Sequence, residues 1–231
     1  MSKIESNPKK QKNTNGNKPN FFLKGLVHIM GYGFFAVIHR LRFPYASLKK
    51  KAVKNREINK SKNLKFPLNG QSMGELKDMR IGSCAFSHSG CGAIATFNAM
   101  SMIGLEPKME EIVDFYEHKG LILNARMGVN PSAVKRYLDA NNLQWRFYSG
   151  KNDWDANWGD DRVAIVLYWW VNPKGCGAHY VAVEHTDEGL CVYNEFGNRD
   201  TAYKYKDIQT FISTGQYKRV VAMFVIDKKV N

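Results

Sequence analysis

The order of the residue patterns is the feature that most limits how this chain can fold, because helix-type patterns come first and strand-type patterns follow. Three helices are expected, over residues 91–103, 108–118 and 130–141. Five strands are expected after them, over residues 145–148, 163–171, 179–185, 190–194 and 219–226. Helices followed by strands are typical of an α+β domain in which the two kinds of element segregate.

Positive charge divides the chain into a basic arm and a globular remainder. Residues 1–65 hold 16 Lys or Arg side chains against two acidic ones, a net charge of +14, whereas residues 66–231 hold 18 basic and 19 acidic side chains, a net charge of −1. We expect residues 1–20 to be a disordered basic tail, because they are polar and Lys-rich. Residues 21–65 are interpreted as an apolar segment plus a Lys/Arg-rich linker, and residues 66–231 as one folded domain.

The arm has the composition of a membrane-surface anchor. An apolar stretch of 14 residues from Gly25 to Ile38 precedes a run of cationic side chains, a combination that anionic lipid headgroups attract. The stretch is shorter than the roughly 20 residues of a spanning helix, and no small-x-small cleavage site of a signal peptide follows it. A helix packed on its own domain, followed by a solvated linker, is the alternative. Nucleic acid is not an expected partner, since no recognised binding motif accompanies the charge.

The cysteines indicate a reducing compartment. Four cysteines scattered over residues 84–191 are too few for a disulfide framework in a chain of 231 residues. We therefore expect a cytoplasmic protein, which its basic arm would hold at the cytoplasmic face of a membrane.

One cysteine is placed where a nucleophile would be expected. Cys91 lies between Gly90 and Gly92 at the point where a loop becomes a helix, so unpaired backbone N–H groups and the helix dipole can stabilise a thiolate. His179 begins an apolar strand and can serve as base. Asn194 ends the next expected strand and can hold the imidazole in one tautomer if the two strands pair.

Each of these residues also has an ordinary structural interpretation. Free cysteine is among the most buried residue types, so Cys91 could simply fill a tight turn. A histidine at a strand start is often structural, and Asn194 alone could be a turn residue. Their order and sequence context together favour catalysis.

The combined pattern resembles the papain-like cysteine peptidases, and among them the C39-like domains related to bacteriocin-leader-processing peptidases. The similar segments lie within residues 80–226 and are Ser89-Gly90-Cys91-Gly92-Ala93-Ile94-Ala95, His179-Tyr180-Val181-Ala182-Val183 and Val192-Tyr193-Asn194. The resemblance implies a papain-like fold, with an N-terminal helical lobe that carries the cysteine and a C-terminal antiparallel β lobe. It also implies that Cys91 is the nucleophile, His179 the base and then acid, and Asn194 the orienting residue.

The chain departs from this group at two places. The group usually has Asp, often followed by Pro, where this chain has Asn194 followed by Glu195. The group also places a Gln five or six residues before the nucleophile to complete the oxyanion hole, whereas Ala85 and Phe86 occupy those positions here. Loss of one such donor typically costs about 10²- to 10³-fold in rate. The candidates for oxyanion or supporting roles are therefore Ser87, His88, Ser89 and Glu195.

Metal and redox roles are alternatives for the same residues. Cys84, Cys91, Cys176 and His179 could be four zinc ligands, although six residues separate the first pair instead of the usual two to four. Cys176 could also be a redox partner of Cys91. The Asp/Trp-rich segment 152–161 has oxygen ligands for calcium without the spacing of an EF-hand loop. We expect no metal and no cofactor.

The sequence thus predicts a cysteine peptidase or related thiol hydrolase that cleaves a peptide or amide bond through a thioester on Cys91. Its expected partner is a peptide or protein substrate. A papain-like binding module with weakened catalysis and a non-hydrolytic acyltransferase of a biosynthetic cluster are the alternatives.

Overall fold

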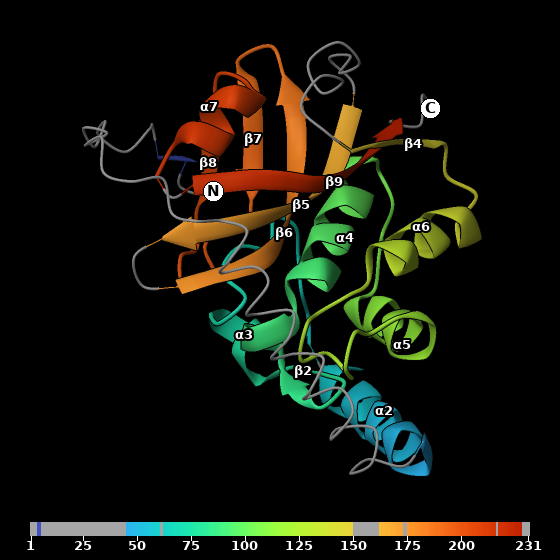
Figure 1. Ribbon diagram of the computed structural model, residues 1–231. Coiled ribbons are helices and arrows are strands. Elements are labelled where there is room, and N and C mark those ends of the chain that lie inside the picture. Colours follow the sequence, from blue (N-terminus) through green and yellow to red (C-terminus); the bar gives the residue numbers. More distant parts are fainter. Residues whose placement is uncertain are drawn as a thin grey trace.

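The computed structural model describes residues 4–5, 45–60, 62–149, 162–172, 175–215 and 217–227 (Figure 1). It confirms an α+β architecture, in which most of the helices precede the main strands in the chain. The helices are α2 (Tyr45–Lys60), α3 (Phe86–Ser89), α4 (Cys91–Met102), α5 (Met109–Lys119), α6 (Pro131–Ala140) and α7 (Ile208–Ser213), with a 3-10 turn at Gly74–Asp78. The three helices expected from the sequence are α4, α5 and α6, each within two residues of its expected ends.

One large sheet has the strand order β1-β8-β7-β6-β5-β9-β4. The last six strands in this order pair antiparallel. These are β4 (Trp145–Tyr148), β5 (Arg162–Asn172), β6 (Gly175–Thr186), β7 (Gly189–Tyr193), β8 (Ala202–Tyr205) and β9 (Tyr217–Asp227). A separate small hairpin joins β2 (Arg80–Ile81) to β3 (Cys84–Ala85).

The tail expected to be disordered contributes one short strand. Ile4–Glu5 form β1, which pairs in parallel with β8 at the edge of the sheet. The other residues of the range 1–20, and residues 21–44 with the expected apolar anchor, lie outside the described residues.

Both faces of the sheet are covered, which explains the continuous apolar run of β5. Val163, Ile165 and Leu167 belong to the core shared with α4, α5 and α6. Tyr168 and the other alternate residues of β5 belong to a second core that includes Phe211 of α7. Figure 1 shows α4 against the sheet, with α5 and α6 farther out. The sheet and α4 therefore form the rigid frame on which a site can be held.

Helix α2 lies within the interval expected to be a linker, and it packs on α5. Two buried asparagines attach it to the β2 region. Asn59 exchanges two hydrogen bonds with the backbone of Arg80, at 2.8 and 3.0 Å, and Asn55 donates to the carbonyl of Gly82 at 2.9 Å. Residues 45–60 are therefore part of the folded structure, which corrects the expectation of a simple linker there. None of the described helices is long and apolar enough to span a membrane.

Candidate active site

Cys91 is the first residue of α4, but the short helix α3 and Gly90 precede it where the sequence predicted a loop. Its side chain is 7% exposed, and the backbone N–H of Gly92 points to the sulfur. A Cβ at Gly92 would lie 2.9 Å from the Cβ of Val129 and 3.5 Å from the ring of Tyr180 on β6. A residue without a side chain is therefore required for the start of α4 to approach Val129, in the segment between α5 and α6, this closely.

His179 lies on β6, and its side chain and the Cys91 thiol are near enough for each to shift the pKa of the other. The ring of Tyr168, which pairs with His179 across β5 and β6, meets the imidazole edge to face at 5.8 Å. The structure thus brings together two residues that are 88 positions apart in the sequence.

The imidazole is held in one tautomer. His179 Nε2 lies 2.6 Å from the backbone carbonyl oxygen of Asn194. A carbonyl can only accept, so Nε2 carries the proton and Nδ1 is left to accept the proton of the thiol. This is the arrangement in which a neutral imidazole can act as base toward Cys91.

Electrostatic interactions favour the charged forms of both partners. Burial raises the pKa of Cys91, but the hydrogen bond and charge of His179, together with the backbone N–H groups of Tyr180 and Gly92, hold the pKa below its usual value. Burial lowers the pKa of His179, but its contacts with Cys91, the Asn194 carbonyl and the Glu195 carboxylate raise the pKa above its usual value. The pair is therefore biased toward thiolate and imidazolium.

Asn194 contacts the imidazole through its backbone and not through its side chain. The residue is fully buried, has a φ of 61°, and its side-chain oxygen and nitrogen have no hydrogen-bond partner in the described structure. Its N–H donates to Oδ1 of Asn69 at 2.8 Å, so both sides of its backbone are engaged. Asn194 was expected to end a strand and to contact the imidazole through its amide, whereas it lies just after β7 and contacts the ring through its carbonyl.

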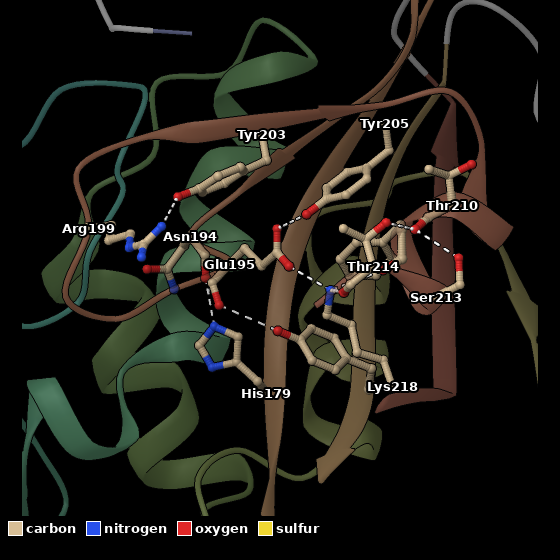
Figure 2. Close-up of polar contacts among 12 residues, drawn as sticks. His179, Asn194, Glu195, Arg199, Tyr203, Tyr205, Thr210, Ser213, Thr214 and Lys218 are labelled. Atoms are coloured by element: carbon tan, nitrogen blue, oxygen red, sulfur yellow. Dashed lines mark hydrogen bonds and ion pairs between the residues drawn. The ribbon is translucent and has the colours of Figure 1, made fainter. Parts of the chain in front are cut away.

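Glu195 does not accept a hydrogen bond from His179. Its two carboxylate oxygens accept from Lys218 Nζ and from the Tyr205 hydroxyl, each at 2.6 Å (Figure 2). The carboxylate therefore lies behind the site, where it acts on His179 through charge.

The three candidates for the oxyanion hole have different environments. Ser89 is buried and donates its hydroxyl to the carbonyl of Ala125, so that donor is already used. His88 is exposed and Ser87 is half-buried. Gln71 was not expected from the sequence, yet its side-chain Nε2 donates to the carbonyl of Ser87 at 2.6 Å.

Gln71 has the features of a donor that the sequence pattern could not locate. It is 8% exposed, its side-chain oxygen has no partner in the described structure, and it packs on Gly197 in the loop after Asn194. Its amide group carries a second N–H in addition to the one that binds Ser87. The only signal in the sequence is an amide side chain next to Gly70, in a turn 20 residues before Cys91.

Metal binding finds no support among these residues. Within the described ranges, no group of three His, Cys, Asp or Glu side chains could hold a metal ion, so the four residues considered for zinc do not form such a site. No disulfide bond joins Cys91 to Cys176. The Asp/Trp-rich segment 152–161 lies in the part of the chain that is not described.

Comparison with known proteins adds no family assignment. No protein-family model matches the chain, and no curated protein matches it significantly.

Proposed function

We propose that the protein is a papain-like thiol hydrolase, most similar in chemistry to cysteine peptidases, with Cys91 as nucleophile and His179 as general base and acid. The single observation that carries the proposal is the pairing of Cys91, the first residue of α4, with His179, where contacts with His179 and with backbone N–H groups outweigh burial and hold the pKa of the thiol below its usual value. A purely structural buried cysteine would have a raised pKa, as burial produces for Cys191.

The geometry supports a two-step reaction through a thioester. The Cys91 thiolate attacks the carbonyl carbon of an amide, and the C–N bond breaks as imidazolium His179 gives its proton to the departing amine. Water then attacks the thioester while His179 takes its proton, the carboxylic acid leaves, and the thiolate–imidazolium pair is restored. The N–H···O bond to Asn194 keeps the ring in the plane needed for both transfers.

Charge on the tetrahedral oxygen needs donors near Cys91. The first backbone N–H groups of α4 have no acceptor within the helix and point toward this end of the site. We assign Gln71 as the candidate for the side-chain donor, because its amide donates to Ser87 in α3, the short helix that precedes Cys91. This role replaces the glutamine that is missing at Ala85 and Phe86.

A binding module of the same fold is the second candidate, because residues 85 and 86 lack the usual amide. An acyltransferase uses the same thioester and differs only in the nucleophile that accepts the acyl group. The acyltransferase would form a different product from the same thioester, and the binding module would form no product.

The test is cleavage of a diverse peptide pool, followed by mass spectrometry, with the parent protein and the Cys91→Ala variant. New termini that depend on Cys91 are the expected result. Trapping the acyl group with hydroxylamine as a hydroxamate separates a thioester enzyme from a binding module, and transfer to added amines in place of water would indicate the acyltransferase. Identical pools with the parent and the variant, with no trapped acyl group, would contradict the proposal.

A further inference from the structure

A buried ion pair lies directly behind the residue that holds the imidazole. Lys218 Nζ donates to Glu195 Oε1 at 2.6 Å, and the two side chains are 1% and 0% exposed. Tyr205 donates its hydroxyl to the other carboxylate oxygen, also at 2.6 Å (Figure 2). Glu195 directly follows Asn194, whose carbonyl accepts the ring N–H of His179. The ion pair therefore fixes Glu195, the residue next to the carbonyl group that accepts the hydrogen bond of His179.

Lys218 connects Glu195 to two other elements. Its ammonium group also donates to the carbonyls of Phe211 in α7 and Thr214 just after it, each at 3.0 Å, so all three donors are used. The ammonium group lies 4.5 Å from the centre of the Phe211 ring as well. Lys218 itself belongs to β9, so it connects Glu195 to both β9 and α7.

Stability alone does not explain why charge is buried here. Removing two ions from water is costly, and replacing a buried ion pair with apolar side chains is often neutral or stabilising by about 1–4 kcal/mol. The groups around His179 are the Cys91 thiol from α4, the Tyr168 ring from β5 and the Glu195 carboxylate, so Glu195 supplies the negative charge from the protein frame. The proposed reaction has a use for such a charge, because it passes through imidazolium.

We propose that the Glu195–Lys218 ion pair is a positioning device for His179, which holds the Asn194 carbonyl against the ring N–H. The inference rests on the proposed roles of Cys91 and His179. Glu195 and Lys218 touch neither the thiol nor the ring, and they act through the Asn194–Glu195 peptide and through charge.

The experiment compares the parent with Glu195→Gln and with the double variant Glu195→Gln/Lys218→Met. The double variant leaves no unpaired buried cation, so it keeps the test valid if the single variant does not fold. The matched control is Glu188→Gln, because Glu188 also forms an ion pair, with Lys204, but at the surface. Three readouts are taken: the rate of Cys91 alkylation against pH, the NMR titration of the His179 ring, and unfolding by denaturant.

The proposal predicts that both Glu195 variants lower the pH at which the His179 ring loses its proton and weaken protection of its Nε2 proton from exchange. It predicts that alkylation of Cys91 near neutral pH slows by about tenfold or more, the effect of roughly one charged hydrogen bond. Glu188→Gln should leave the titration of the His179 ring and the alkylation rate of Cys91 unchanged. The double variant should remain folded.

A folded double variant with the parent's ring titration and alkylation rate would overturn the positioning role. Failure of the proposed function looks different, because the parent Cys91 would then react no faster than Cys84. The titration of the His179 ring and the exchange of its proton still test the positioning role of the ion pair in that case, since neither depends on the reactivity of Cys91.

Discussion

Asn194 illustrates why the atoms of a residue matter more than its type. The sequence suggested a side-chain amide as the group that orients the imidazole, whereas the backbone carbonyl accepts the ring N–H and the side chain has no partner in the described structure. A residue that acts through its backbone can be replaced if its replacement adopts the same conformation. Here the φ of 61° selects which replacements can do so.

The first prediction is that Asn194→Gly keeps a rapid alkylation of Cys91, since glycine accepts a positive φ and retains the carbonyl. Asn194→Ala should keep the rate too, but lower the free energy of unfolding by about 1–2 kcal/mol because alanine is strained there. Alkylation kinetics and denaturant unfolding of the two variants measure these effects. A loss on the order of 10²-fold or more in both variants would instead assign the role to the side-chain amide.

At the scale of single residues, the sequence could predict that Cys91 and His179 form a pair because each lies in a distinctive local context. Cys91 has glycine on both sides at a helix start, and His179 directly precedes the apolar run of β6, a strand that begins at Gly175 instead of at His179 as expected. Asn69 could not be predicted, because it contacts Asn194 across 125 positions in the sequence. Gln71 and Lys218 could not be predicted either, since their contacts with Ser87 and Glu195 form only after the chain has folded.

Among the elements, the long and strongly patterned segments were predictable and the short or charged ones were not. Strand β4 has the expected bounds, β5, β6 and β9 extend the expected segments by a few residues, and β7 begins and ends one residue earlier than expected. Strand β8 and helix α7 are four and six residues long, too short for a clear period. The sequence of α2 predicts a linker because lysines dominate its composition. The buried polar contacts of the helix come instead from its asparagines.

Helix α2 yields the second prediction, which concerns stability. Asn59→Ala removes both part-buried hydrogen bonds to the Arg80 backbone, so the free energy of unfolding should fall by about 1–3 kcal/mol. The exposed Lys54 on the same helix supplies the control, because Lys54→Ala should change the free energy of unfolding by less than about 0.5 kcal/mol. Urea unfolding measures both. Equal stabilities would mean that α2 is not part of the cooperative unit.

At the scale of the whole molecule, charge separates the arm from the domain. Residues 1–65 carry a net +14 and the remaining chain carries −1, and part of the positive charge lies on the exposed side of α2, at Lys50 and Lys54. Because α2 packs on α5, lipid headgroups that bind these cations would hold the folded domain itself close to the surface. We propose an anionic membrane surface as partner on this basis.

The third prediction is that the protein co-sediments with vesicles containing phosphatidylglycerol and not with pure phosphatidylcholine vesicles. Each lysine near an anionic surface contributes about 1 kcal/mol, so Lys50→Gln/Lys54→Gln should weaken binding by roughly tenfold or more. Replacing the exposed Lys77 and Lys119 with Gln supplies the matched control, which should bind like the parent. Equal binding to both kinds of vesicle would contradict an electrostatic partner.

The central claim is that His179 activates Cys91, and the most direct measurement is the rate of Cys91 alkylation by iodoacetamide against pH, in the parent and in His179→Ala. A lowered pKa means that the thiolate persists to lower pH, so labelling should stay rapid below about pH 8.5, the usual pKa of a free thiol. The rate near neutral pH should fall in the variant, while Cys191, whose pKa burial raises, should react slowly in both proteins. A Cys91 that follows the pH profile of a free thiol, unchanged by loss of His179, would contradict the account.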